Sequence, residues 1–337
     1  MFVSDVLVIG GGIAGLSVAA RLSRHGIVTV LEGESAPGYH ASGRSVAFAH
    51  YGLGDAPVRT LTALSMAELA AHGSVHPALH IAGAGDIAAL DALEEVHRQF
   101  GCDYARIGPE EARALMPRLK PEAFAAALVD HGSLKLDTHA MLQAHVAQIR
   151  AGRGAVIPGA RVMMLGHEGG RWVAVRADGT RHGAPVLVNA AGAWADEVAR
   201  MAGVTPIGIA PRRRTVISFP APDGDDVSQW PFTKTVSEGF YLLPEGSGQL
   251  LASAMDQTPS APCDAAAEEM DVAVAIDRLE GVVFDAGNVA DGVVDVAQAL
   301  QPVGVGGAAA VGVERRQAER LALVGVARLG PVVVLNE

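Results

Sequence analysis

Three glycines and one acid near the start of the chain are the residues whose types and spacing point most directly to chemistry. Gly10, Gly12 and Gly15 form a Gly-x-Gly-x-x-Gly turn, and Glu32 follows about 20 residues later. In such a turn the first glycine allows a tight bend, the second lets a pyrophosphate approach the backbone, and the third lets the next helix lie close to the strand. An acid at this distance can bind ribose hydroxyl groups. The spacing therefore predicts a dinucleotide site.

The segments around this turn have the patterns needed to position it. Residues 6–9 are an apolar run of strand length, residues 16–25 carry apolar side chains at helical spacing, and residues 28–31 predict a second strand. Together they predict a β-α-β unit whose helix N-terminus offers free N–H groups and a partial positive charge to phosphates. The alternative is a glycine-rich turn in an ordinary α/β domain.

A second buried strand is predicted at residues 185–189. It leads into Ala190, Ala191 and Gly192, whose small side chains leave room for a cofactor. Between the two motifs the chain predicts helices and strands of a scaffold, including a helix that begins after an acidic N-cap at Asp137.

Composition limits the remaining possibilities. The 337 residues can form one large or two moderate cores, and the net charge of -11 argues against a nucleic-acid partner. Cys102 and Cys263 match no metal-binding or redox spacing, so no metal site is expected. We find no signal peptide and no run of roughly 20 apolar residues, and we therefore expect a cytoplasmic protein without an integral membrane segment.

The loop after Glu32 carries a family resemblance. It reads Gly38-Tyr39-His40-Ala41-Ser42-Gly43-Arg44-Ser45, and together with the turn and the acid it resembles the D-amino-acid oxidase (DAO) superfamily of FAD enzymes, most closely those similar to D-arginine dehydrogenase. The resemblance implies an α/β fold, α+β overall, with a Rossmann-like FAD-binding domain and an inserted antiparallel-sheet substrate domain. We expect the first at residues 1–80 with 125–205, and the second at 81–124 with 206–280.

The resemblance also assigns site residues. The expected FAD contacts are Gly10, Gly12, Ala14, Gly15, Glu32, Ser42, Arg44, Ser45, Ala47, Phe48, Val162, Ala191 and Gly192. Substrate contacts are expected from Tyr51 and Tyr241 and from one arginine of the cluster 212–214, with Arg214 preferred to Arg213. His50 is a further candidate near Tyr51, and Asp86 is a candidate equivalent of the family's acid that pairs with a substrate guanidinium.

The C-terminal segment departs from the family. Residues 281–337 hold 15 Val, 9 Gly and 10 Ala, with no Ser, Thr, Lys, His, Tyr, Trp, Met or Cys. We find neither the arginine expected for the substrate carboxylate nor the late glycine-rich loop. The hypothesis is an aberrant tail, with a strand and a helix of the flavin domain missing.

The activity that the resemblance implies is oxidative deamination of a D-amino acid similar to D-arginine. Hydride transfer to the flavin N5 yields a 2-oxo acid and ammonia, and the final electron acceptor is not specified by the sequence. Two alternatives remain open: a glycine- or sarcosine-type amine oxidase that uses oxygen, and a truncated, inactive flavin-binding protein.

Overall fold

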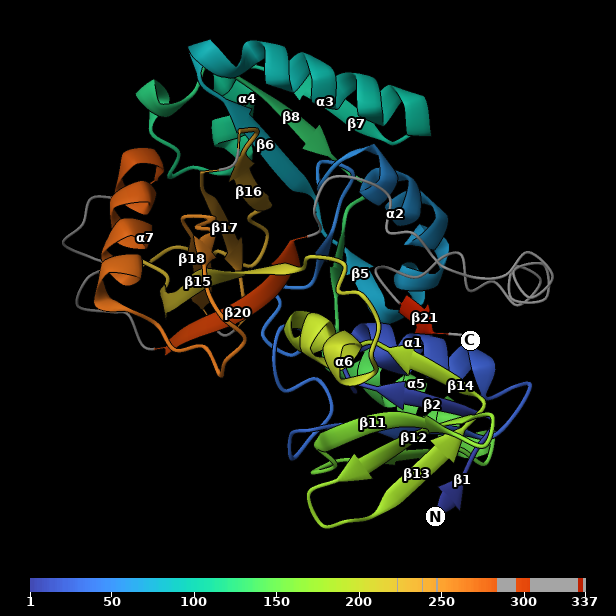
Figure 1. Ribbon diagram of the computed structural model, residues 1–337. Coiled ribbons are helices and arrows are strands. Elements are labelled where there is room, and N and C mark those ends of the chain that lie inside the picture. The colour runs from blue at the N-terminus through green and yellow to red at the C-terminus, as the bar shows by residue number, and fades with distance from the viewer. Residues whose placement is uncertain (223, 238, 247, 284–294, 304–332, 336–337) are drawn as a thin grey trace.

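Two sheets of different construction organise the protein (Figure 1). The computed structural model describes residues 1–222, 224–237, 239–246, 248–283, 295–303 and 333–335. A five-stranded sheet carries the glycine turn, and a nine-stranded sheet forms the other half of the molecule. The predicted fold class, a Rossmann-like unit joined to a largely antiparallel sheet, is confirmed.

The five-stranded sheet has the order β10-β3-β2-β14-β21. Its strands are β2 (Val6–Ile9), β3 (Val28–Leu31), β10 (Ala155–Ile157), β14 (Val186–Asn189) and β21 (Val333–Leu335). The first four are parallel, and β21 is antiparallel to β14. Parallel strands are buried on both faces, which explains why β2 and β14 read as continuous apolar runs.

Helices cover one face of this sheet, and a meander covers the other. On the first face α1 (Ile13–Leu22) and α5 (Thr138–Ala151) pack through Leu16, Val146 and Ile149. The second face is covered by α6 (Ala195–Met201), which follows the 3₁₀ turn η4 (Gly192–Trp194), and by the sheet β1-β13-β12-β11. Its strands are β1 (Phe2–Val3), β11 (Val162–Glu168), β12 (Arg171–Arg176) and β13 (Arg181–Ala184).

The nine-stranded sheet has the order β19-β15-β18-β17-β16-β6-β8-β7, with β20 on the free side of β15. Its neighbours are antiparallel except for β16 and β6. The strands are β6 (Ala78–Ala82), β7 (Tyr104–Ile107), β8 (Ala126–Asp130), β15 (Ala210–Pro220), β16 (Phe232–Thr235), β17 (Tyr241–Pro244), β18 (Gln249–Ser253), β19 (Thr258–Pro259) and β20 (Asp295–Val303).

The two faces of this sheet have different neighbours. Leu79, Leu242 and Ala252 point to the face that packs on α4 (Pro109–Leu115) and α7 (Glu269–Val282). Ala78, Phe232 and Leu243 alternate with them and point to the opposite face, which we call the inner face. Toward its β6–β8 end the inner face packs on Leu90 of α3 (Ile87–Phe100). Around Phe232 it meets Val46 and Phe48 from the loop after β3.

A small sheet, one further helix and three 3₁₀ turns complete the fold. The small sheet β4-β9-β5 is made of β4 (Phe48–Ala49), β9 (Leu134–Leu136) and β5 (Gly73–Val75). The remaining elements are α2 (Ala56–Leu69) and the 3₁₀ turns η1 (Ala70–His72), η2 (Ala84–Asp86) and η3 (Pro121–Ala123). The domain division expected at residues 80 and 125 falls inside β6 and just before β8, and both strands pair in the larger sheet.

The C-terminal segment differs from the sequence expectation in one respect. A strand of the flavin domain was expected to be missing, but β21 pairs with β14 at the edge of the five-stranded sheet. Val333, Val334 and Leu335 have the β-branched and apolar character that suits pairing with an open strand. β20 likewise pairs with β15, from Ala210 with Val303 to Ser218 with Asp295. Most of the predicted aberrant tail, residues 284–294, 304–332 and 336–337, lies outside the described residues.

No helix in the described part of the chain combines the length and the apolar character needed to cross a bilayer.

Candidate functional site

The glycine turn is built so that side chains cannot enter it. Gly10 has φ +106°, and a Cβ there would lie 2.3 Å from the carbonyl oxygen of Ala190. A Cβ on Gly15 would lie 1.9 Å from the carbonyl oxygen of Gly10. A Cβ on Gly12 would meet the Ser42 hydroxyl at 3.1 Å. Backbone therefore forms the surface at the α1 N-terminus, where Ala14 lies half-buried.

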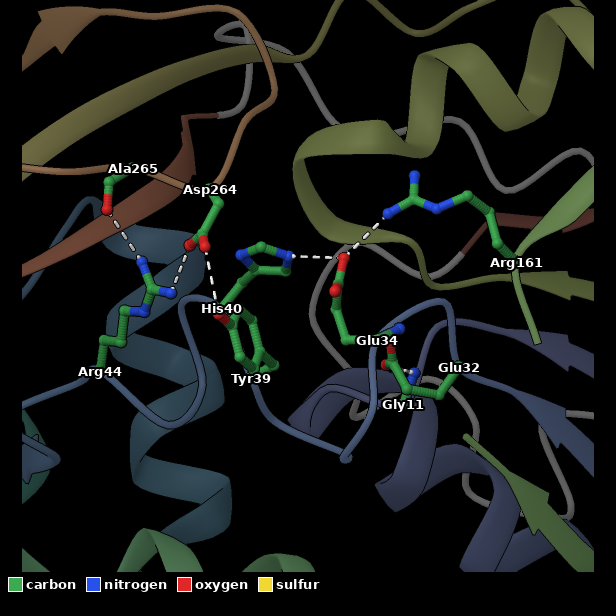
Figure 2. A network of polar contacts seen from close by, with 9 residues as sticks. All are labelled: Gly11, Glu32, Glu34, Tyr39, His40, Arg44, Arg161, Asp264 and Ala265. Carbon is green, nitrogen blue, oxygen red and sulfur yellow. Dashed lines mark hydrogen bonds and ion pairs between the residues drawn. The ribbon is translucent and has the colours of Figure 1, made fainter. Parts of the chain in front are cut away.

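Glu32 closes one side of this turn. Its Oε2 accepts a hydrogen bond from Gly11 N at 2.7 Å, and its Oε1 accepts one from Glu34 N at 2.7 Å (Figure 2). An ionised carboxylate can accept about four hydrogen bonds, so lone pairs remain for ribose hydroxyls. Ser42 closes the other side, because its hydroxyl accepts a hydrogen bond from Ile13 N at 2.9 Å and caps the first turn of α1.

The end of β14 faces the same turn. Asn189 donates from Nδ2 to the Ala195 carbonyl at 2.7 Å, and its Oδ1 accepts from Ala191 N at 3.3 Å. Gly192 has φ +54°, a left-handed conformation that glycine adopts without strain. Val162 begins β11 and packs half-buried against the cluster that contains Leu31. The two predicted motifs are therefore brought together by the parallel pairing of β2 with β14.

Arg44 contacts a different partner from the one the sequence suggested. Its guanidinium donates to Asp264 Oδ1 at 2.5 Å and to the Ala265 carbonyl at 3.1 Å, and it lies 5.2 Å from the ring centre of Tyr39. The Tyr39 hydroxyl also donates to Asp264, at 3.1 Å (Figure 2). In this structure Arg44 thus ties the loop after β3 to residues 264–265. Its predicted phosphate contact stays a prediction.

The loop continues along a cavity of about 550 Å³ between the two halves of the molecule. Residues 43–47 line it on one side, Lys135–Thr138 line it on another, and Val216, Ser218 and Leu251 line it from the inner face. Ala47 has φ +49°, and Ser45 supports this bend by accepting a hydrogen bond from Ala47 N at 3.0 Å. A non-glycine residue in this region stores strain, which often marks a functional site.

Aromatic rings form the neighbouring part of the inner face. Phe48 stacks on Phe232 with ring centres 4.4 Å apart, and Phe232 lies 5.5 Å from Tyr241. His50 lies 5.6 Å from Phe232. Burial and the nearby Lys234 ammonium lower the pKa of His50 to about 3, so its imidazole is neutral at ordinary pH.

Tyr241 and Arg214 lie on the same face of this sheet. Arg214 shares the face of Val216, donates from Nε to the Asp256 carbonyl at 3.3 Å, and acts electrostatically on the Tyr241 hydroxyl. Burial raises the pKa of Tyr241 to about 12, although Ser253 and Arg214 oppose the shift. The hydroxyl is therefore a neutral hydrogen-bonding group. Burial also raises the pKa of Asp256, whose Oδ1 accepts from Thr215 N at 2.9 Å.

The other substrate candidates lie elsewhere. Arg213 points to the α7 side, where it pairs with Glu268 and, at 3.0 Å, with Asp271. Tyr51 stacks on Phe100 of α3 at 5.4 Å and meets His97 edge-on, so its ring contacts are with α3 and not with the Tyr241 face. Asp86 ends η2, beyond the Ala82 end of β6. Arg214 therefore lies on the face of Tyr241 and Arg213 on the opposite one, and Tyr51 and Asp86 have no contact with Tyr241 among the described interactions.

Sequence reasoning missed a buried polar row across the inner face. The strand register aligns His80 with Lys234, Lys234 with Tyr241, and Tyr241 with Ser253. All four residues are buried. His80 is the polar residue of the apolar strand β6, a signal visible in the sequence. β16, β17 and β18 follow one another in the chain, but β6 is distant, so only the pairing of β6 with β16 shows that all four residues are neighbours. In the described part of the chain, no three His, Cys, Asp or Glu side chains gather as metal ligands.

The glycine turn with its acid, joined to a large antiparallel sheet, defines the class of FAD-binding oxidoreductases with an α/β fold. The chain belongs to the DAO family within it, because the family model described as FAD dependent oxidoreductase matches residues 5–325. This match continues past Glu280, where the sequence alone showed no further resemblance. The open glycine turn, the Glu32 carboxylate and the small residues after β14 fit FAD, which is the cofactor.

Solved structures support the fold. Glycine oxidase from Geobacillus kaustophilus has a TM-score of 0.80 at 18% identity, covering 94% of this chain and 87% of that chain. L-proline dehydrogenase from P. horikoshii has a TM-score of 0.80 at 19% identity, covering 93% and 85%. L-alpha-glycerophosphate oxidase from Mycoplasma pneumoniae, solved with FAD bound, has a TM-score of 0.78 at 17% identity, covering 91% and 85%. At these identities the likeness concerns the fold.

Proposed function

We propose that the chain oxidises an amino acid at the bond between Cα and the amino nitrogen, and that its substrate is a D-amino acid. FAD, when bound, would supply the two-electron acceptor for this oxidation, which converts the amino acid to an imino acid. The imino acid released from this step adds water and yields a 2-oxo acid and ammonia. The observation that carries the proposal is that Arg214 and the buried Tyr241 share the inner face, which packs on Phe48 at the side of the FAD-binding half.

The chain's own groups have separate roles in this proposal. The guanidinium of Arg214 binds the substrate carboxylate, and the neutral Tyr241 hydroxyl orients it by a hydrogen bond. Phe48 and Phe232 exclude water from the apolar side of the substrate. The thirteen predicted FAD contacts, among which Glu32 faces the ribose and Ser42 closes the turn, hold the cofactor. A neutral substrate amine needs no general base, and His50, with its low pKa, is not a cation that would repel a protonated one.

The charges at the proposed site limit which substrate side chains can bind. Resemblance to D-arginine dehydrogenase-like enzymes predicts a basic side chain. However, the inner face near Tyr241 carries the cations Arg214 and Lys234, and the carboxylate that acts on Tyr241, Asp256, accepts a hydrogen bond from Thr215 N. Like charges in a site of low dielectric repel strongly. We therefore favour a substrate with a small or apolar neutral side chain over D-arginine.

The test is the flavin absorption band of the FAD-loaded chain under anaerobic conditions. D-alanine, glycine and D-arginine are added separately, with L-alanine as the stereochemical control. Glycerol 3-phosphate serves as the control for a CH–OH donor, because the fold is shared with a glycerophosphate oxidase. Rapid bleaching by D-alanine supports the proposal. Faster bleaching by D-arginine would indicate a substrate with a basic side chain. Bleaching by glycerol 3-phosphate alone would overturn the proposal of amine oxidation.

A second measurement separates the two remaining alternatives. Hydrogen peroxide formed in stoichiometric amounts after admission of air indicates an oxidase of the glycine or sarcosine type. A flavin band that neither the amino acids nor glycerol 3-phosphate bleach indicates an inactive flavin-binding protein.

A further inference from the structure

Lys234 is a buried cation in the middle of the nine-stranded sheet. It lies on β16, and only 3% of its surface is exposed. The chain has three lysines, Lys120, Lys135 and Lys234, and the other two are further exposed. A buried ammonium is costly unless polar or charged groups surround it, so such a residue is usually retained for a specific role.

The sheet register determines which face Lys234 occupies. Its neighbour Thr233 pairs with Leu79 and Leu242, which belong to the core beneath α4 and α7. Lys234 therefore shares the opposite face with Phe232, two residues earlier, and with Tyr241, its cross-strand partner. Directly opposite residues have Cβ atoms about 5 Å apart. Lys234 thus stands beside Tyr241 on the inner face.

Lys234 and Arg214 are the cations of this face near Tyr241, because the neighbouring histidines are neutral. The low pKa of His50 keeps that imidazole uncharged, and burial also lowers the pKa of His80 well below its usual value. In both cases the positive charge of Lys234 adds to the shift, which indicates that its ammonium lies near both rings. Tyr241 is thus placed between Lys234 on one side and Arg214 on the other.

We propose that Lys234 is a second positioning residue for the substrate, holding the carboxylate together with Arg214 across the Tyr241 hydroxyl. This inference rests on the proposed amino-acid substrate. Two cations from different strands neutralise an anion better than one. Two anchors would fix the orientation of Cα as well as its affinity.

The experiment compares charged and neutral probes of the same shape. Propionate and propionamide are titrated into the oxidised, FAD-loaded protein, and binding is followed by the perturbation of the flavin absorption band. Variants are Lys234→Met, Lys234→Arg and the control Lys120→Met, which removes one positive charge from the α7 side of the sheet. Lys234→Met is expected to weaken propionate binding about 30-fold, the effect of losing a charged hydrogen bond, and to change propionamide binding less than threefold. Lys120→Met should change neither.

Lys234→Met with wild-type affinity for propionate overturns the proposal, as does an equal loss for both probes. If Lys234→Met does not retain FAD, Lys234→Arg decides: it should bind propionate with a changed affinity and propionamide with an unchanged one, whereas parallel changes count against a charge role. Turnover is a separate readout. If no amino acid bleaches the wild-type flavin, the proposed function fails, while the propionate titrations still determine whether Lys234 binds a carboxylate.

Discussion

The dinucleotide-binding half and the inner face of the larger sheet are encoded in different ways. Gly10, Gly12, Gly15 and Glu32 lie within one β-α-β unit, and their contacts with one another are set by local geometry. The inner face instead gathers His80, Lys234, Tyr241, Ser253 and Arg214 from five strands whose order in the sheet differs from their order in the chain. The glycine turn and its acid therefore depend on a short continuous motif, and the proposed substrate site depends on strand register.

This difference predicts how each half responds to change. In the glycine turn the available space is limiting, so a single added methyl group should be severe. On the inner face each residue contributes one charge or hydrogen bond, so single changes should be graded and should leave FAD in place.

The largest effect is expected at Gly15. In Gly15→Ala the new Cβ would lie 1.9 Å from the Gly10 carbonyl oxygen, and only a shift of α1 against β2 can relieve this contact. We expect a loss of stability of about 3 kcal/mol or more and purification without FAD. Flavin content and thermal unfolding measure it. The matched control is Gly166→Ala, where a Cβ meets nothing within 4 Å. A Gly15→Ala protein that retains full FAD would show that the turn is not held as tightly as described.

The second effect separates two adjacent arginines. Arg214→Met should lower kcat/KM about 100-fold, the loss of a charged hydrogen bond to the substrate carboxylate, with normal FAD content. Arg213→Met removes the pair with Asp271 on the other face, so it should lower the melting temperature and leave kcat/KM within about twofold, as expected for a residue remote from the chemistry. Steady-state kinetics and calorimetry of both variants test this. The reverse pattern would assign the substrate arginine to Arg213.

More of the dinucleotide-binding half than of the inner face could be predicted from the sequence. The positions and roles of the three glycines in the turn follow from their spacing. The strand, the helix and the acid around Gly10–Gly15 were also predictable. Tyr241 and Arg214 were reached through resemblance, but their proximity depends on the pairing of β15, β18 and β17. Lys234 and Arg44 show the limit. A lone lysine in a strand does not reveal its face, and the contact of Arg44 with Asp264 joins residues 220 apart.

The third effect concerns the Tyr241 hydroxyl. Tyr241→Phe should lower kcat/KM about tenfold, the value of one hydrogen bond, without changing the shape of the pH profile between pH 6 and 10, because the pKa near 12 keeps this tyrosine protonated there. The pH dependence of the free energy of unfolding provides an independent test of the raised pKa of Tyr241. The folded-state pKa lies above the ordinary value of 10, so the unfolded chain binds fewer protons between pH 10 and 12, and wild-type stability should fall across that range. The fall should be smaller in Tyr241→Phe, as measured by urea unfolding at pH 9 and pH 11. A new basic limb in the activity profile of the variant would contradict this role.

The smallest effect is expected where the two regions are tied together. Asp264→Asn removes the negative charge that holds both Arg44 and Tyr39, which weakens the anchor of residues 264–265 on the loop that follows Glu32. The pair is exposed on the Asp264 side, and such pairs contribute about 0.2–1 kcal/mol, so FAD dissociation should accelerate only about two- to fivefold. The matched control is Glu168→Gln, which breaks an exposed pair with Arg181 on the distant meander and should not alter FAD release. Flavin fluorescence after dilution measures the rate. If Asp264→Asn instead binds FAD more tightly, then Asp264 competes with the cofactor for Arg44, and the predicted phosphate contact of Arg44 would gain direct support.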